Sequence, residues 1–94
     1  MPSNSTLKQF YYTYVLLSHK DNKHYIGRTN NLHRRIAEHN NGKNISTAPR
    51  RPFTLIYCEA CLSEDDAIQR EKYLKATVGR RYLAKRLRNY LRTI

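Results

Sequence analysis

The sequence predicts an α/β (α+β) fold in which a three-stranded, mostly antiparallel sheet is flanked by about three helices, in the order β-β-α-β-α-α. Three short runs are rich in aromatic and β-branched residues, and three other segments have apolar residues at helical spacing. The 94 residues suffice for one hydrophobic core. We therefore expect a flexible polar leader at residues 1–9 and a single domain over residues 10–94.

The first two strands are expected to form a hairpin. Residues 10–17 (FYYTYVLL) are apolar or aromatic except for Thr13, which is typical of a strand covered on both faces. Asp21 and Asn22 indicate a turn before a second strand at residues 24–28 (HYIGR). Because side chains alternate along a strand, a loop with an even number of residues would place Tyr14 and Tyr25 on the same face.

The first helix is expected to begin after Asn30 or Asn31 and to end at Gly42, with Leu32 and Ile36 facing inward. A loop at residues 43–52, which contains two prolines, then leads to a third strand at residues 53–60 (FTLIYCEA).

A second helix is expected to begin at Ser63, where three acidic residues favour a helix N-terminus, and to end at Gly79. Its inward stripe would comprise Ala67, Ile68, Leu74 and Val78. The last segment has helical apolar spacing and a basic outer face, and its predicted core positions are Leu83, Leu87, Tyr90, Leu91 and Ile94.

The charge of the chain indicates a polyanionic partner. Eighteen Lys and Arg against seven Asp and Glu give a formal net charge of +11, so DNA is the expected partner, with RNA as an open alternative. No apolar run approaches the roughly 20 residues needed to span a bilayer, so we expect a cytoplasmic protein that associates with the nucleoid when bound to DNA. Cys58 and Cys61 lack a second ligand pair, which favours reduced packing residues over a zinc site.

Three polar residues occupy positions that suggest chemistry. Glu71 lies on the second predicted helix within one turn of the inward stripe, so its carboxylate would point to the edge of the core. Such a charge must pair with Arg or Lys or bind a metal, and both alternatives stay open. Arg35 and His39 lie four residues apart on one face of the first predicted helix, where a purely solvent-exposed role is the alternative.

The order of these residues resembles the GIY-YIG nucleases, a family that includes excision-repair incision subunits, homing endonucleases and restriction enzymes. Tyr25-Ile26-Gly27 matches half of the family's name, and Tyr12-Thr13-Tyr14 retains the tyrosine of the other half. Arg35 follows Gly27 by eight residues, His39 follows one turn later, and Glu71 lies on the helix after the third predicted strand. The asparagine that some members carry about a dozen residues further on is replaced by Leu83.

The resemblance implies a small single-domain nuclease, similar to the N-terminal nuclease domain of excision-repair incision subunits, which hydrolyses DNA phosphodiester bonds in branched or damaged DNA. Its site would comprise Tyr14, Tyr25, Arg35, His39 and Glu71. Glu71 would hold one divalent cation, Mg²⁺ or Mn²⁺, and Arg35 would bind phosphate oxygens. Tyr14 would accept the proton of the attacking water, and Tyr25 and His39 would orient that water or share the proton.

Contacts to the nucleic-acid backbone are expected from seven cationic residues around this site: Arg28, Lys43, Arg50, Arg51, Arg80, Arg81 and Lys85. We expect a monomer with weak sequence preference, to which a protein partner would supply specificity. The alternatives are a catalytically weak nucleic-acid-binding or adaptor module with the same fold, and a basic RNA-associated protein.

Overall fold

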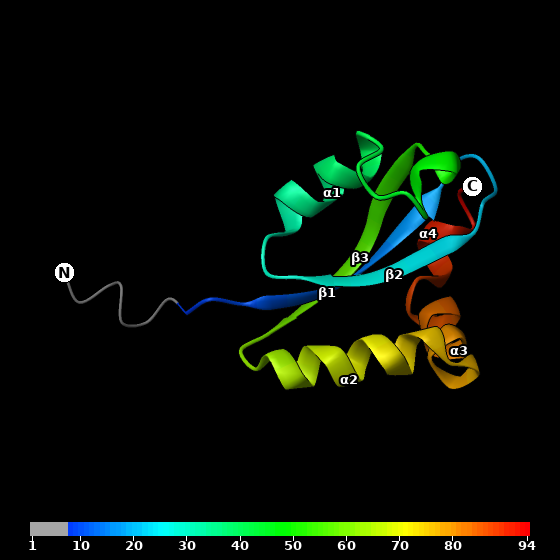
Figure 1. Ribbon diagram of the computed structural model, residues 1–94. Helices are drawn as coiled ribbons and strands as arrows, with labels where there is room; N and C mark the ends of the chain where they lie inside the picture. The colour runs from blue at the N-terminus through cyan, green and yellow to red at the C-terminus, as the bar shows by residue number, and fades with distance from the viewer. Residues whose placement is uncertain (1–7) are drawn as a thin grey trace.

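The computed structural model describes residues 8–94, and it confirms the predicted α+β fold (Figure 1). Three antiparallel strands, β1 (Tyr11–Ser18), β2 (His24–Thr29) and β3 (Phe53–Cys61), form one sheet in the order β2-β1-β3. The central strand is therefore the first in the sequence, which agrees with its almost uninterrupted burial. Most of the leader predicted at residues 1–9 lies outside the described residues.

The hairpin register brings two of the predicted site residues to one face of the sheet. Leu17 lies opposite His24, so the even number of residues 18–23 separates the last pair of the ladder. Tyr14 lies opposite Gly27 and Leu16 opposite Tyr25, which places Tyr14 and Tyr25 on the same face. The prediction made from strand alternation is thus confirmed.

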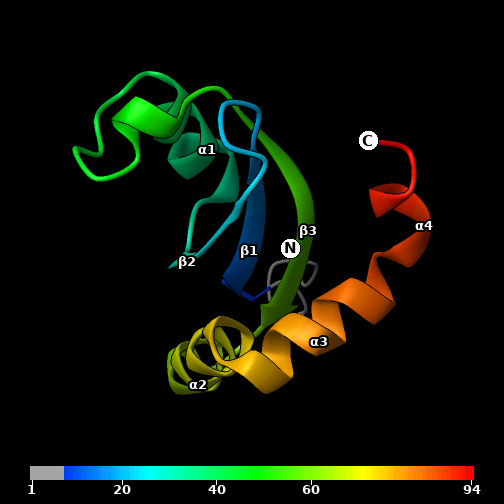
Figure 2. The same cartoon turned by 90° about the vertical axis from the view of Figure 1, so that its right-hand side faces the viewer.

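Helix α1 (Leu32–Asn40) covers this face of the sheet (Figure 2). Its N-cap residue is Asn31, whose side-chain oxygen accepts a hydrogen bond from the backbone N–H of Arg34 at 3.1 Å. Beyond its end, Gly42 adopts a positive φ of 76° that glycine tolerates best. Under the helix lies a core of buried and half-buried residues that comprises Tyr14, Leu16, Phe53, Tyr25, Leu32, Ile36 and Leu55.

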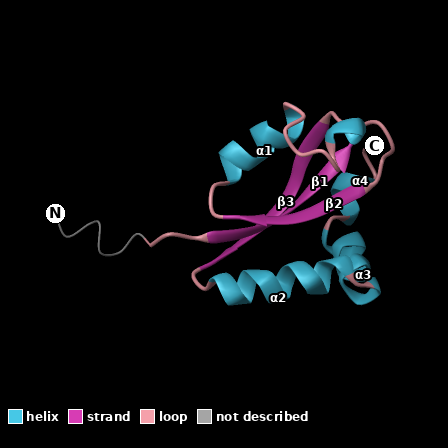
Figure 3. Ribbon diagram, in the orientation of Figure 1, coloured by secondary structure: helices cyan, strands magenta, loops and turns pink. Residues whose placement is uncertain are grey.

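Three further helices, α2 (Glu64–Lys75), α3 (Thr77–Arg86) and α4 (Arg88–Leu91), lie on the other side of the sheet (Figure 3). Their buried side chains form a second core with the sheet, which comprises Val15, Ile26, Leu74, Leu83 and Leu87. The sheet is therefore apolar on both faces, as the pattern of the first strand predicted. None of the described helices is long and apolar enough to cross a membrane.

The predicted end of the second helix, at Gly79, was wrong. Helix α2 ends at Lys75, Ala76 is extended with a ψ of 166°, and α3 begins at Thr77. Gly79 lies inside α3 instead of ending a helix. A glycine is needed at this position because a Cβ atom there would collide with the backbone of Tyr73 and Leu74. The glycine thus permits a close approach of α2 and α3. This role could not be predicted from the tendency of glycine to end helices.

This break also changes which apolar residues are buried. Val78, predicted in the inward stripe, is 59% exposed, because the extended Ala76 resets the helical phase before it. At the chain end, α3 and α4 replace the single predicted helix. Tyr90 and Ile94, predicted in the core, are 37% and 63% exposed.

Candidate active site

Tyr14 lies at the centre of the sheet and is almost completely buried. Its ring passes over Gly27 on the neighbouring strand, and a Cβ atom on Gly27 would collide with the hydroxyl and Cζ of Tyr14. The glycine of the Tyr-Ile-Gly motif is therefore required by the tyrosine that faces it across the ladder.

His39 meets Tyr14 from helix α1. The Tyr14 hydroxyl lies 2.9 Å from Nε2 of His39, which has no solvent exposure. The Tyr25 ring is 5.0 Å from the His39 ring, and the Phe53 ring is 5.9 Å from it on another side. Three of the five predicted site residues, Tyr14, Tyr25 and His39, thus form one aromatic cluster.

Thr47 completes this cluster and was missed by the sequence analysis. Its hydroxyl lies 2.8 Å from Nδ1 of His39, and the side chain is 1% exposed. Thr47 belongs to the loop between α1 and β3, just before the short 3-10 helix η2 (Ala48–Arg50). A hydroxyl residue in a loop is too common a feature to have identified it from the sequence.

Arg35 lies one turn before His39 on α1, and its Nη1 donates to Oε1 of Glu38 at 3.0 Å. Burial raises the pKa of Tyr14 to about 12, while the guanidinium of Arg35 opposes that rise. The Tyr25 hydroxyl and the charge of Glu71 raise the pKa of Tyr14 further. At neutral pH Tyr14 is therefore protonated, and Arg35 is the neighbour that most favours its ionised form.

The pKa of His39 is lowered by burial and, to a smaller extent, by the charge of Arg35, while Glu38 acts in the opposite direction. His39 is consequently neutral at neutral pH. A neutral imidazole carries one N–H donor and one acceptor nitrogen, so it can receive a proton from Tyr14.

Glu71 reaches the site from the other side of the sheet. On α2 its Oε1 lies 3.3 Å from Nε of Arg28 and its Oε2 lies 3.0 Å from Nζ of Lys75, and its side chain is 19% exposed. Arg28 also contacts Glu64 at 3.0 Å, so it ties β2 to α2 by two ion pairs. Because Arg28 lies opposite Thr13 in the ladder, this group is on the face of β2 opposite to Tyr14.

The candidate site therefore surrounds strand β2, which is an edge strand of the sheet. Tyr14, Tyr25, Arg35 and His39 lie on the α1 side, whereas Glu71 and Arg28 lie on the α2 side. The two halves are within electrostatic reach, since the charge of Glu71 raises the pKa of Tyr14. In this structure Glu71 forms ion pairs with Arg28 and Lys75. Pairing with Arg or Lys was one of the two alternatives predicted for it.

Three of the seven predicted backbone contacts have their guanidinium groups engaged within the protein. Arg28 forms the ion pairs with Glu64 and Glu71 described above. Arg50 donates to Oδ2 of Asp21 at 2.8 Å and to the carbonyl oxygen of His24 at 3.3 Å. Arg51 donates to the carbonyl oxygen of Ala48 at 2.7 Å. In contrast, four others are exposed at the surface: Lys43, Arg80, Arg81 and Lys85.

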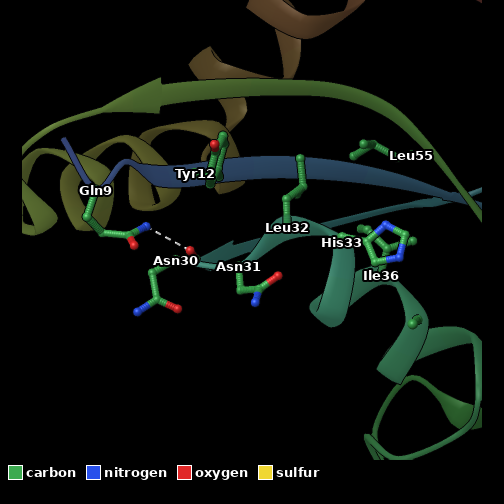
Figure 4. A pocket seen from close by; sticks show the side chains of 9 residues that line it. Gln9, Tyr12, Asn30, Asn31, Leu32, His33, Ile36 and Leu55 are labelled. Atoms are coloured by element: carbon green, nitrogen blue, oxygen red, sulfur yellow. Dashed lines mark hydrogen bonds between the residues drawn. The ribbon is translucent and has the colours of Figure 1, made fainter. Parts of the chain in front are cut away.

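A cavity of about 720 Å³ lies between α1, the start of β1 and β3 (Figure 4). Tyr12, Leu32, Ile36 and Leu55 form its apolar walls, and Gln9 bridges its mouth through a 2.9 Å hydrogen bond to the carbonyl oxygen of Asn30. Tyr12 lies two residues before Tyr14 on the same face of β1, yet none of the five predicted site residues lines the cavity.

Comparison with known proteins identifies one family over most of the chain. The family described as "GIY-YIG catalytic domain" matches residues 10–84. This range includes all five predicted site residues and all three strands of the sheet.

Several bacterial proteins are similar to this chain. The UPF0213 protein YazA of Bacillus subtilis is 46% identical over 57 residues, which cover 60% of this chain and 58% of that protein. The UPF0213 protein SH2523 of Staphylococcus haemolyticus is 42% identical over 66 residues, which cover 69% of this chain and 79% of that protein. A UPF0213 protein of Lactiplantibacillus plantarum is 40% identical over 76 residues, which cover 78% of this chain and 73% of that protein. No solved structure matches this chain.

Proposed function

Because the chain belongs to the GIY-YIG catalytic domain family, we propose that it is a metal-dependent endonuclease that hydrolyses DNA phosphodiester bonds. The main support is the buried contact of 2.9 Å between the Tyr14 hydroxyl and a neutral His39. A core that needed only packing would gain little from a histidine held between two hydroxyl groups. Such a pair can take the proton of an attacking water, because the histidine accepts the proton that the tyrosine gives up.

Arg35 is suited to bind the phosphate whose bond is cleaved. Its guanidinium is permanently charged, and its fork of N–H donors matches two phosphate oxygens. The Arg35 side chain is only partly exposed. It lies close enough to Tyr14 to lower the pKa of the Tyr14 hydroxyl. In the proposed mechanism it would neutralise charge that develops on the phosphoryl group.

Glu71 is the residue that would hold the metal. Mg²⁺ is commonly bound through one or two carboxylates, with water and substrate phosphates as its other ligands, so a single carboxylate at the edge of the site fits it. Within residues 8–94 no group of three His, Cys, Asp or Glu side chains forms a preformed cage. A bound Mg²⁺ or Mn²⁺ would supply charge neutralisation at the leaving oxygen.

The cationic residues near β2 and α3 would guide the DNA backbone toward the site. Arg28 lies beside Glu71, and the exposed Arg80, Arg81 and Lys85 lie on α3. Contacts of this kind bind phosphates and carry no sequence information. We propose branched or damaged DNA as the substrate class, with any sequence or pathway specificity coming from a protein partner.

Cleavage of plasmid, nicked and branched DNA in Mg²⁺ or Mn²⁺ tests this function. We expect the parent to cleave at least one substrate, and Glu71→Gln and Arg35→Ala each to lose about 100-fold or more of kcat. Glu64→Gln is the matched control, because it removes a carboxylate that also contacts Arg28 but is 54% exposed. Unchanged cleavage in both site variants would contradict the proposal.

One observation favours a second candidate, a DNA-binding adaptor with little activity. Both carboxylate oxygens of Glu71 are occupied by cationic side chains, Arg28 and Lys75. If these pairs persisted in the DNA complex, no metal would bind there. Tight, salt-sensitive DNA binding without cleavage across substrates and metals would support this candidate over the nuclease.

A further inference from the structure

We infer that Thr47 is a positioning residue that holds the ring proton of His39 on Nδ1 and so keeps Nε2 free to accept the proton of Tyr14. The three side chains form one buried chain of contacts, from the Tyr14 hydroxyl to Nε2 of His39 at 2.9 Å and from Nδ1 to the Thr47 hydroxyl at 2.8 Å. The catalytic consequence of this inference rests on the proposed nuclease function. The assignment of the ring proton does not.

The direction of the chain follows from the number of protons that it contains. A threonine hydroxyl has one proton to donate, and the carbonyl oxygen of Asn44 lies 3.4 Å from it. When Thr47 donates to Asn44, its oxygen must accept from His39, so the single N–H of the neutral ring is on Nδ1. Nε2 then presents a lone pair to Tyr14.

The opposite arrangement leaves a buried proton without an acceptor. If Nε2 carried the proton and donated to the Tyr14 oxygen, the Tyr14 hydroxyl would need another acceptor. Arg35 also lies close enough to donate a hydrogen bond to the Tyr14 oxygen, but a guanidinium offers donors alone. Among residues 8–94, His39 is therefore the one acceptor for the Tyr14 proton. A buried hydroxyl without an acceptor loses its hydrogen bond to water without replacement, which disfavours that arrangement.

The loop around Thr47 is built to hold the hydroxyl in place. The carbonyl oxygen of Asn44 accepts from the backbone N–H groups of Thr47 and Ala48 at 3.2 and 2.9 Å. The side-chain Oδ1 of Asn44 accepts from the backbone N–H and the hydroxyl of Ser46 at 3.0 and 2.8 Å. The Thr47 carbonyl oxygen in turn accepts from the backbone N–H of Arg50 at 2.9 Å.

The other neighbours of His39 do not replace Thr47 as the partner of Nδ1. Arg35 and Glu38 from α1 act on the ring through their charges, and Tyr25 from β2 and Phe53 from β3 contact it edge to face. Tyr14 from β1 occupies the opposite nitrogen. Among residues 8–94, Thr47 is therefore the side chain that hydrogen-bonds Nδ1 and can hold the ring proton there.

The role in catalysis can be written as a balanced step. As the attacking water loses a proton to the Tyr14 oxygen, the Tyr14 proton passes to Nε2 of His39, and the hydroxide oxygen bonds to phosphorus. The bond from phosphorus to the leaving oxygen breaks, and that oxygen takes up a proton from solvent. His39 ends as an imidazolium whose Nδ1–H still donates to Thr47, so the new charge forms with both N–H groups satisfied.

Two variants of Thr47 separate the hydroxyl from its packing. Thr47→Val keeps the shape and removes the hydroxyl, whereas Thr47→Ser keeps the hydroxyl. The ring nitrogens of His39 are observed by ¹⁵N NMR in the full chain, without DNA or metal, at a pH well above the His39 pKa. We expect the Nδ1–H form in the parent and in Thr47→Ser, and a shift toward the Nε2–H form in Thr47→Val.

Cleavage kinetics provide the second readout. We expect Thr47→Val to lower kcat by about 10-fold to 100-fold with an unchanged KM for DNA, and Thr47→Ser to stay within about 3-fold of the parent. If Thr47→Val does not fold, Thr47→Ala takes its place. An unshifted Nδ1–H form in the variant without the hydroxyl overturns the inference. If the parent cleaves no DNA, the proposed function fails, and the NMR comparison still decides the role of Thr47.

Discussion

Tyr14 can serve as the proton acceptor of the attacking water only if it gives up its own proton at the same time. Its pKa of about 12 leaves almost no ionised tyrosine at neutral pH. His39 supplies the acceptor at 2.9 Å, and burial keeps that histidine neutral. The two residues are therefore better described as one proton-transfer unit than as separate groups.

The charges beside His39 should move its pKa in opposite directions. Arg35 lowers the His39 pKa and Glu38 raises it. We expect Arg35→Gln to raise the His39 pKa toward the ordinary value of 6.5 and Glu38→Gln to lower it further. An NMR titration of His39 in the three proteins measures both changes, and shifts of the same sign in the two variants would contradict the prediction.

The contact between Gly27 and Tyr14 should appear as a stability effect. Gly27→Ala places a Cβ atom against the Tyr14 ring, and we expect a loss of about 1–3 kcal/mol in the free energy of unfolding. Chemical denaturation measures this loss. In a Tyr14→Leu background the same change should cost less, because the ring is absent; equal costs in both backgrounds would exclude the contact as the cause.

Helix α1 is the element that brings Arg35 and His39 to the sheet. Its nine residues are few for a helix, so its start must be fixed by a cap and its face by packing. Asn31 provides the cap, and Leu32 and Ile36 provide the apolar face. The position of two candidate site residues thus depends on a short helix with a defined first turn.

Removal of this cap should destabilise the protein. We expect Asn31→Ala to lower the free energy of unfolding by about 1 kcal/mol, because the Arg34 N–H loses its acceptor. Asn30→Ala is the control, since Asn30 does not cap the helix. Similar losses in both variants, measured by denaturant unfolding, would show that the cap is not responsible.

Helices α2 and α3 meet at Gly79, where packing opposes local preference. Alanine favours a helix over glycine by about 1 kcal/mol, but a Cβ atom at this position would meet the carbonyl oxygen of Tyr73. We therefore expect Gly79→Ala to lower the melting temperature. A higher melting temperature would mean that the α2–α3 junction can move apart without cost.

At the scale of the whole molecule, the proposed site depends on both layers of helices around one thin sheet. The α1 side contributes the aromatic cluster and Arg35, and the α2 side contributes Glu71. Arg28 ties β2 to α2 through its contacts with Glu64 and Glu71. Any change that separates α2 from β2 should therefore alter the site without touching Tyr14.

The net charge of +11 should make DNA binding strongly dependent on salt. We expect Arg81→Ala, which removes an exposed cation, to reduce the slope of log affinity against log salt by about 1. Arg50→Ala should instead lower the melting temperature, because Arg50 holds Asp21 and the carbonyl oxygen of His24. Binding titrations at several salt concentrations check the first result, and an unchanged slope for Arg81→Ala would remove it from the binding surface.

The sequence by itself determined the order of the strands and helices along the chain up to α2. It also determined that Tyr14 and Tyr25 share one face of the sheet. These features follow from side-chain alternation and helical spacing, which act between residues close in the chain. The spacing of Arg35 and His39 on one helix was predictable for the same reason. The chain's resemblance to the GIY-YIG nucleases was also visible in its motifs.

Only the tertiary structure decided the features that depend on residues far apart in the chain. Thr47 reaches His39 because the loop before β3 folds back onto α1, and Glu71 pairs with Arg28 because α2 lies along β2. Gly79 is required by the backbone of the preceding helix, which no local pattern reports. Contacts of this kind are set by how two elements pack, and residue spacing within either element does not specify them.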